Sequence, residues 1–539
     1  MDIKCHALDN WKACRSALAT AIRNYLAGCA ELRSTCSQIQ HQSRTRRELE
    51  PVLLAVNAEL ADLVSDETTL REARATLSVL RNTSSTLSPV HTLPPEILAR
   101  IFQIAQTSPS HASSPSSPSP GHTFAQVCSY WRATATNLPY LWTHICIAPT
   151  QTSYEYATLS LHRSKGLPIY MNIYRQKVEK WDRYLYKMRW KTLLASMGRH
   201  VHALNIVDSF DSPETSLGQT IRLLLSHGSP GVMSTLHIRR PETGQIESLN
   251  PLSAGQSDSA VLHSISVLHL GNISIPWTST IYHNLVDLRL QFHYDPQSIL
   301  TSQLAGILAA SLGLTILKLE FINIVPSEDW NEEKLVRLAH LKVLYLNNLG
   351  KNGLVALMST LSLSSCLDTL EVGIHDCYDR YSEEGAHLAQ DFLHGAHIKT
   401  LALTPNLDYN DDAQLVFSVF KMIPSLENLI LDNYNIDYMC ETRGMIDESE
   451  TNVGTTSRLP NLFLVTQELD LEELKLIVSF YGVETLHLHG KHWNWPADEL
   501  KTALLKSCHN LTCVISDEDP TIDWPCRTLF NRRLRESAT

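Results

Sequence analysis

The sequence predicts an α/β fold in which helices at the N-terminus precede a long solenoid of parallel strands. Three observations lead to this prediction: helical periodicity over the first part of the chain, an apolar helix start at residues 93–102, and a leucine pattern that recurs from Val201 onward. Apolar residues spaced three and four apart are typical of a helix face, whereas L-x-x-L-x-L segments at regular intervals are typical of stacked repeats. We therefore expect regions at 1–86, 87–150, 151–200 and 201–539, the third being a connecting helical segment.

Composition narrows the classes of protein to consider. The 539 residues are 43% hydrophobic and 19% charged, which is ample for several buried cores. The formal net charge of -11 argues against a general nucleic-acid binder, whose affinity comes from neutralising phosphates. No apolar run approaches a membrane span, and the N-terminus lacks the apolar core of a signal peptide. We expect neither nucleic acid nor membrane as a partner, and a cytoplasmic or nuclear location.

The N-terminal region, residues 1–86, has helical periodicity throughout. Leucines from Leu60 to Leu77 approximate a heptad alternation that Glu67 and Arg74 interrupt. The pattern is too short and irregular for a long coiled coil. A helical hairpin or a modest dimerising helix fits it better.

A firm helix start follows in the segment LPPEILARIF, residues 93–102. Pro94 and Pro95 suit a first helical turn, and Glu96 complements the positive end of the helix dipole. Apolar side chains recur on one face at Ile97, Leu98, Ile101, Phe102 and Ala105. A helix this short is not stable alone, so its stripe must be covered by its own domain or by a partner.

Two further short helices are expected after a low-complexity stretch. Residues 107–121 are rich in serine and proline, which offer little apolar surface to offset the entropy of ordering. We therefore predict a mobile loop there, within an insertion at 106–121. Val127, Cys128, Trp131 and Ala135 then form a second helical stripe. Pro139 can start a third helix, which carries Leu141 and Trp142.

These segments resemble a known domain. SPVHTLPPEILARIF, VCSYWR and LPYLW, within residues 88–147, closely resemble the F-box of fungal F-box-like proteins, apart from the Ser/Pro insertion. The resemblance implies docking on the Skp-family adaptor of a cullin-RING ubiquitin ligase. Phe102 and Ala135 are assigned to the internal core. The implied adaptor contacts are Leu93, Pro94, Ile97, Leu98, Ile101, Val127, Cys128, Trp131, Leu141 and Trp142.

The region 201–539 is organised by a repeat. Twelve copies of an L-x-x-L-x-L pattern begin at Val201, Met233, Ile265, Leu285, Leu314, Leu341, Leu367, Ile398, Leu426, Leu459, Val483 and Leu511. Their central residues, from Leu204 to Val514, recur at a mean interval of about 28, within the range of irregular leucine-rich repeats. The strands would line the concave face of a solenoid. The alternative is a conventional α/β domain with helices on both faces of the sheet.

The residue after each central leucine should face the concave surface. Basic and histidine residues come early among these positions, and a strip of His237, His269, Arg289, Lys318 and Tyr345 is the candidate substrate site. Such a strip would attract an acidic or phosphorylated segment. Alternatively, the charges merely keep the face soluble. In chain order, the concave positions are expected at Asn205, His237, His269, Arg289, Lys318, Tyr345, Glu371, Ala402, Ile430, Phe463, His487 and Ile515.

Motifs of catalysis are not found. The sequence has no phosphate-binding loop, no G-x-S-x-G elbow and no H-E-x-x-H helix, and its 12 cysteines include no C-x-x-C pair. His487 and His489 share a strand face and could hold a metal, but solvated histidines fit that face better. We expect a non-catalytic protein without cofactor or metal.

The function that follows is that of a substrate-recognition subunit of a cullin-RING (SCF-type) ligase. The F-box would dock on the adaptor, and the repeats would hold a protein target. Two alternatives stay open: an F-box scaffold that degrades nothing, and an enzyme site hidden in the repeats.

Overall fold

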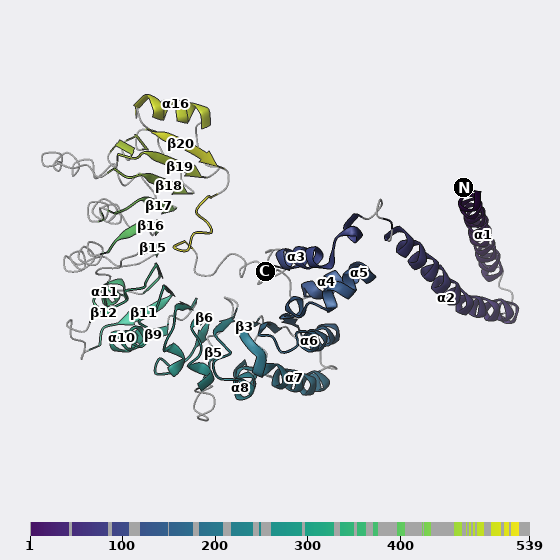
Figure 1. Cartoon of the computed structure of the whole chain (residues 1–539), viewed down its shortest axis with the longest axis horizontal. Helices are drawn as coiled ribbons and strands as arrows, with labels where there is room; N and C mark the ends of the chain where they lie inside the picture. The colour runs from purple at the N-terminus through teal and green to yellow at the C-terminus, as the bar shows by residue number, and fades with distance from the viewer. Residues whose placement is uncertain are drawn as a thin grey trace. The chain divides into compact units, whose positions relative to one another are not determined.

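The computed structural model places most of the chain (Figure 1). It describes residues 2–41, 46–82, 84, 89–106, 119–148, 150–175, 183–208, 217–240, 247–249, 260–293, 297–327, 335–349, 353–362, 370–375, 396–404, 423, 425–432, 458–465, 471, 474–475, 478–479, 482–489, 497–507, 511–516 and 519–527.

The chain divides into two compact units, Met1–Pro94 and Pro95–Thr539. The first consists of the long helices α1 (Asp2–His41) and α2 (Arg46–Asn82) and the 3₁₀ helix η1 (Pro89–Thr92), so the helical prediction for this region is confirmed. The Tyr25 hydroxyl donates a hydrogen bond of 2.8 Å to the Glu59 carboxylate, which brings the two long helices together as in a hairpin. Dimerisation through this unit stays a prediction.

The second unit begins with short helices. They are α3 (Pro95–Gln106), α4 (Pro120–Val127), α5 (Ser129–Thr136) and the 3₁₀ helix η3 (Pro139–Trp142). The second predicted helix is wrong in one respect, because Cys128 is extended and separates α4 from α5. Its sulfur caps α5 by accepting the Trp131 amide hydrogen at 3.4 Å.

The predicted Ser/Pro loop ends earlier than expected. Residues 107–118 lie outside the described part of the chain, but Ser119, Pro120 and Gly121 are buried at the start of α4. A Cβ on Gly121 would lie 2.9 Å from the Leu141 carbonyl oxygen and 3.0 Å from the Trp142 ring. Close packing therefore requires glycine here, and the last residues of the low-complexity stretch belong to the folded domain.

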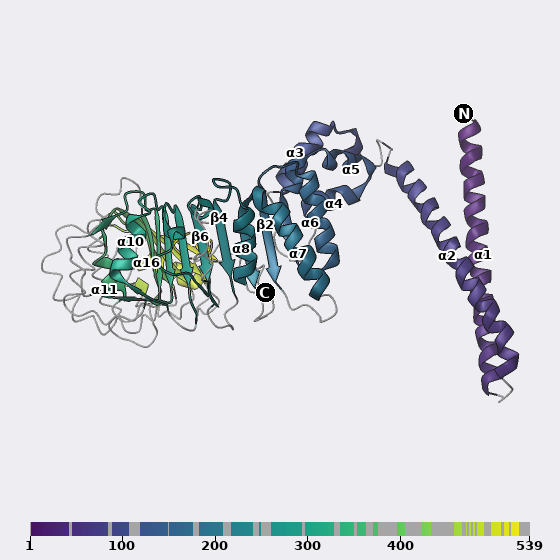
Figure 2. The same cartoon turned by 90° about the horizontal axis from the view of Figure 1, so that it is seen from below.

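A single parallel sheet of 14 strands follows (Figures 1 and 2). Every strand pairs with its neighbours in chain order, as expected of a solenoid. The strands are β1 (His144–Ile147), β2 (Ile169–Arg175), β3 (Val201–Asp208), β4 (Thr235–Arg239), β6 (Val267–Gly271), β8 (Asp287–Gln291), β10 (Ile316–Glu320), β13 (Val343–Asn347), β15 (Leu370–His375), β16 (Ile398–Thr404), β17 (Asn428–Asp432), β18 (Asn461–Val465), β19 (Thr485–His489) and β20 (Thr512–Ser516).

The sheet begins earlier than predicted. All twelve expected repeats contain a strand, but β1 and β2 precede them and pair in parallel with the rest. The segment 151–200 is therefore not only a helical connector, since it contributes β2 between α6 (Gln151–Arg163) and α7 (Arg183–Met197). These two strands bury isoleucine and methionine and lack the leucine pattern, so the pattern did not predict them.

Helices and short strands connect the main strands. The remaining connectors are η4 (Gly198–His200), α8 (Leu217–His227), β5 (Glu247–Ser248), β7 (Ile273–Ser274), η5 (Thr280–Tyr282), β9 (Gln297–Leu300), α10 (Thr301–Ala309), β11 (Ile322–Val325), β12 (Val336–Arg337), α11 (Gly353–Met358), β14 (Leu361–Ser362) and α16 (Ala497–Ser507). The short strands pair with one another as β5–β7, β9–β11 and β12–β14.

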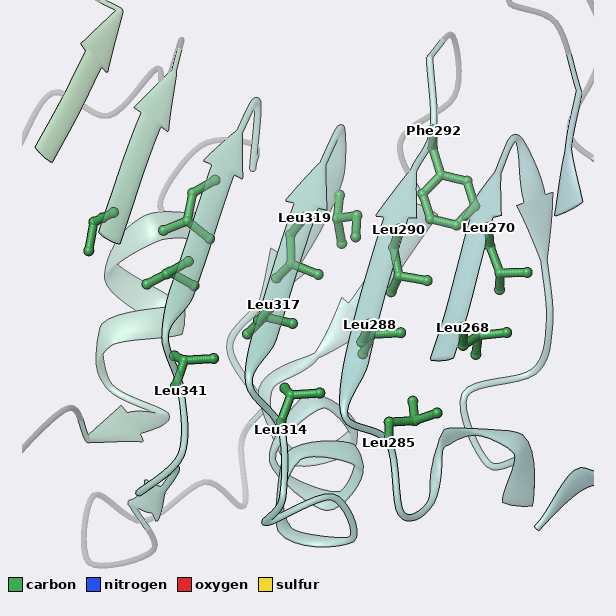
Figure 3. Packing of buried hydrophobic residues seen from close by; sticks show 14 of the residues in the cluster. Leu268, Leu270, Leu285, Leu288, Leu290, Phe292, Leu314, Leu317, Leu319 and Leu341 are labelled. Atoms are coloured by element: carbon green, nitrogen blue, oxygen red, sulfur yellow. The ribbon is translucent and has the colours of Figure 1, made fainter. Parts of the chain in front are cut away.

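One face of the main sheet forms the core. Leucines stack strand by strand, as at Leu268, Leu288 and Leu317 (Figure 3). The same cluster takes in buried residues from α7, α8, α10, α11 and α16, so these helices cover one face of the sheet. For the described helices this rules out the alternative with helices on both faces. Each fully buried leucine contributes about 1.5–3 kcal/mol.

Two concave positions differ from the prediction by register. Gly373, and not Glu371, pairs with Tyr345 and Ala402, so Glu371 lies on the same face two residues earlier. In the last repeat Val514 pairs with His487, and Ile515 packs toward the core. In β15 the register shifts between Leu370 and Glu371, and in the last repeat the motif is degenerate.

Candidate functional site

Helix α3 carries two apolar stripes with different roles. Leu98 and Phe102 are fully buried, whereas Ile97 and Ile101 are 50% and 42% exposed. Ile104, three residues after Ile101, is 59% exposed and extends the outward stripe. From the sequence, the apolar residues of this helix were expected on one face, and Ile104 was not among them. Its position three residues after Ile101 places the two side by side on a helix and could have identified it.

The inward stripe packs on an aromatic core. The Phe102 ring stacks on Phe124 with centroids 4.4 Å apart and meets Trp131 edge-on at 4.9 Å. Trp142 is fully buried, and its indole nitrogen donates to the Ala135 carbonyl at 2.9 Å. Phe102 and Ala135 are both 0% exposed, so their assignment to the core is confirmed.

Three of the implied adaptor contacts are corrected by this packing. Leu98, Leu141 and Trp142 are each 0% exposed, so they build the domain and are not on its surface. The physical reason is the size of the domain: a few short helices can enclose a core only by burying large side chains.

The other implied contacts differ in exposure. Val127 is 55% exposed at the end of α4, and Pro94 is exposed. Leu93, Cys128 and Trp131 are half-buried. The outward apolar surface, defined as Ile97, Ile101, Ile104 and Val127, thus combines three exposed residues of the predicted site with Ile104, which was not predicted.

The short helices are joined firmly to the solenoid. The Arg163 guanidinium of α6 lies 4.4 Å from the centre of the Trp142 ring. His122 of α4 is within 3.0 Å of the Ser160 hydroxyl, and burial lowers the pKa of this histidine. Strand β1, which directly follows η3, enters the main sheet beside β2. The outward apolar surface is therefore held in a fixed position relative to the strands.

Comparison with protein families gives a match to this part of the chain. A family model described as F-box-like matches residues 90–148. Residues 90–148 form an F-box-like domain. A comparison with curated proteins finds no match to the chain.

F-box domains bind Skp-type adaptors in cullin-RING ligases, and F-box proteins are typically non-catalytic. The match therefore supports a general adaptor role in such ligases. It ends at residue 148, just after β1, so the F-box-like domain and the main sheet overlap in sequence.

The second candidate surface is the concave face of the sheet. The five predicted residues occupy aligned positions there, with His237 beside His269, then Arg289, Lys318 and Tyr345. The predicted alignment is confirmed. Their predicted accessibility is wrong, because Lys318 is 1% exposed and Arg289 7%.

Mutual packing explains this burial. Strands stack about 4.8 Å apart, so long side chains at aligned positions cover one another. The rings of His237 and His269 stack with centroids 3.9 Å apart. Arg289 folds back on Asp287 with two contacts of 2.9 and 2.8 Å, and the His269 Nε2 lies 3.1 Å from the same carboxylate.

Asp287 also belongs to this candidate site, although it was not predicted from the sequence. It lies two residues before Arg289, and residues i and i+2 of a strand share a face. Burial alone would raise the pKa of Asp287, but the hydrogen bonds from His269 and Arg289 outweigh it and lower the pKa to about 2. Burial, helped by the nearby His269, lowers the pKa of His237 to about 3. The strip is thus an internally neutralised cluster.

Lys318 is covered from the far end of the chain. Its ammonium group donates to the Pro525 carbonyl at 2.7 Å and lies 5.8 Å from the centre of the Tyr345 ring. Burial lowers the pKa of Lys318 to about 7. No local feature of the sequence places residue 525 beside residue 318.

The histidines and carboxylates of the described residues were examined as possible metal ligands. Among them, no group of three or more His, Cys, Asp or Glu side chains is placed to hold a metal ion. His487 stacks on Phe463 at 4.2 Å, and the His489 Nδ1 lies 3.1 Å from the Ser516 carbonyl. None of the described helices is long and apolar enough to cross a bilayer.

Proposed function

We propose that this protein is a substrate-recognition subunit of a cullin-RING ubiquitin ligase. The F-box-like domain would dock on the Skp-family adaptor, and the solenoid, which fits irregular leucine-rich repeats, would bind a protein target. The observation that carries the proposal is the outward apolar surface on an F-box-like domain that is joined rigidly to a long sheet. Such a subunit works in the cytoplasm or nucleus. It would act by holding the target close to the enzyme that transfers ubiquitin.

The docking contacts are proposed on α3 and α4. Ile97, Ile101 and Ile104 are aligned on one side of α3, and Val127 ends α4. Covering the exposed parts of these side chains with an adaptor would contribute several kcal/mol. Leu93, Pro94, Cys128 and Trp131 complete the proposed set.

The rigid connection supports a receptor that sets the position of its target. A target bound on the solenoid would be held at a fixed orientation to the adaptor, because β1 belongs both to the domain match and to the sheet. Holding two reactants together makes their encounter effectively intramolecular. No residue of this chain needs to take part in the transfer of ubiquitin.

The test is co-purification with a Skp-family adaptor. The double variant Ile97→Asp, Ile101→Asp should lose the adaptor, because two charges would be buried in an apolar interface. The matched control is Leu312→Asp with Leu505→Asp, which alters two leucines that are 57% and 41% exposed on the solenoid. Normal adaptor binding by a folded Ile97→Asp, Ile101→Asp chain would contradict the assignment. Adaptor binding without any cullin subunit would favour the non-degradative scaffold.

A further inference from the structure

The concave face carries a second apolar cluster, separate from the main core. Ala402, Ile430 and Phe463 occupy aligned positions on β16, β17 and β18. They are 0%, 0% and 6% exposed, although no helix of the described chain packs on them. Among the described residues, Cys526 and Trp524 cover them. Cys526 is fully buried in the cluster, and Trp524 is partly buried.

The covering residues belong to a C-terminal segment, residues 519–527. It follows β20 and turns back along the sheet, as the yellow trace in Figure 1 shows. Four contacts hold it to the concave face. They are the Cys526 side chain in the apolar cluster, Trp524 edge-on to Phe463 at 5.1 Å, Arg527 to Asp432 at 2.7 Å, and the Pro525 carbonyl to Lys318 at 2.7 Å.

The segment packs on the sheet by its side chains and does not add a strand to it. Its described backbone hydrogen bonds run within it, from Ile522 to Asp519, from Trp524 to Thr521 and from Arg527 to Trp524. Arg527 also contacts Asp519 at 3.1 Å, which closes the segment on itself. Its outer residues, such as Pro520 and Asp523, are exposed. The segment thus binds the face by side chains and one carbonyl, as a peptide ligand does.

The charges beneath the segment favour a basic ligand. The Asp432 carboxylate accepts the Arg527 guanidinium, and Glu371 on the same face has a buried oxygen, Oε2, that no hydrogen bond satisfies. Among the cations of the strip, Arg289 is paired with Asp287, and Lys318 donates to the Pro525 carbonyl of the segment itself. An acidic or phosphorylated target would have to compete with Asp287 for Arg289, whereas an arginine of a target can take the place of Arg527 at the Asp432 carboxylate.

We infer that the concave surface over β16, β17 and β18 is a binding site for a protein segment that carries an aromatic residue and, three residues later, an arginine, and that the C-terminal segment occupies this site in cis. The inference deepens the proposed function, since it names the chemistry of the target. A tethered ligand acts at a high effective concentration, so a target must displace it. The free site then recognises the aromatic ring at Phe463, the guanidinium at Asp432 and a backbone carbonyl at Lys318.

The experiment uses a chain that ends at Glu518 and a fluorescent synthetic peptide of residues 519–527. The truncated chain should bind the peptide saturably, and the full-length chain at least tenfold more weakly. Asp432→Asn in the truncated chain, and Arg527→Gln in the peptide, should each weaken binding at least tenfold. Glu427→Gln is the matched control, because it removes an exposed carboxylate just before the same strand and should leave binding unchanged. A folded truncated chain that fails to bind, or that binds equally well with Asp432→Asn, would overturn the inference.

A second measurement serves if the truncated chain does not fold. Cys526 and Cys513 are both buried thiols outside any disulfide, one on the inner side of the segment and one in β20. Burial raises the pKa of Cys526 to about 12, so alkylation by iodoacetamide under native conditions requires the segment to lift. Cys526 should react faster than Cys513, and at least tenfold faster again in full-length Asp432→Asn. Equal protection of both thiols in both chains would show that the segment is a permanent part of the fold.

The two proposals fail separately. Neither the peptide titration nor the thiol labelling contains an adaptor, so their outcome does not depend on the F-box-like domain. Loss of adaptor binding in the Ile97→Asp, Ile101→Asp chain likewise leaves the concave site intact.

Discussion

The outward face of α3 and the concave face at β8 and β10 are opposites in chemistry and exposure. On α3, isoleucines 97, 101 and 104 are exposed, although apolar side chains are usually buried. On the sheet, Arg289 and Lys318 are buried, although such side chains are usually solvated. Exposure, and not residue type, therefore separates the surface proposed to bind a partner from the one whose side chains are already paired within the chain.

The largest effect is expected where the concave charges are disrupted. Asp287→Ala should lower the free energy of unfolding by about 3–5 kcal/mol, because it leaves a buried guanidinium without its carboxylate. Lys399→Ala is the comparison, since its 3.0 Å pair with Glu427 is 41% and 50% exposed and should contribute less than about 1 kcal/mol. Urea unfolding of both variants measures the difference. Equal effects would mean that the cluster is solvated.

The next effect separates the two stripes of α3. Leu98→Ala should cost about 2–5 kcal/mol, because it opens a cavity beside Phe102. Ile101→Ala, one turn away, should change stability by about 0.5 kcal/mol or less and act on adaptor binding instead. Denaturant midpoints of the two variants, followed by adaptor co-purification, test both halves of the statement. A large loss of stability in Ile101→Ala would place this residue in the core.

A pH titration examines the stacked histidines. The folded state lowers the pKa of His237 from an ordinary value near 6.5 to about 3, so between these values the unfolded chain binds more protons. Its contribution to stability is present above about pH 6.5 and is lost as the pH falls toward about 3, at up to about 1.4 kcal/mol per pH unit. His237→Phe keeps a ring against His269 and removes this proton uptake, so melting temperatures should fall less steeply from pH 6.5 to 4. An unchanged slope would contradict the assigned burial.

The smallest effect concerns Cys128. Its sulfur caps α5, so Cys128→Ser should preserve stability, whereas Cys128→Ala should cost about 1 kcal/mol. Cys128 is also a proposed adaptor contact, and the affinity of each variant for the adaptor tests this second role. If Cys128→Ser loses adaptor binding but keeps its melting temperature, the thiol touches the adaptor as well as capping the helix.

The sequence predicted most strands of the main sheet because leucine spacing reflects a physical requirement. Each strand must bury two residues of one face against its neighbours, as Leu288 and Leu290 do, and that requirement is local. Strands β1 and β2 meet it with isoleucine and methionine, so a leucine pattern could not find them. The F-box-like helices were predictable for the same reason, since proline, glutamate and the apolar stripe of α3 lie within one short segment.

The candidate sites were predicted in part. The alignment of His237, His269, Arg289, Lys318 and Tyr345 followed from repeat spacing alone. Their burial did not, because it depends on contacts between strands and on Pro525, which is 207 residues from Lys318 in the chain. Likewise, spacing placed Ile97 and Leu98 together on the apolar side of α3, and only the packing of Phe102 on Phe124 decides which of them points inward.

The covering of the concave face by residues 519–527 has a consequence for the order in which the protein is made. Translation proceeds from the N-terminus, so β16, β17 and β18 are complete before the segment that covers them has been synthesised. During that interval Cys526 and Trp524, the described residues of this segment that pack on Ala402, Ile430 and Phe463, are still missing. If this part of the sheet is the binding site proposed above, it would be accessible to other molecules until residues 519–527 have been made and have packed on it.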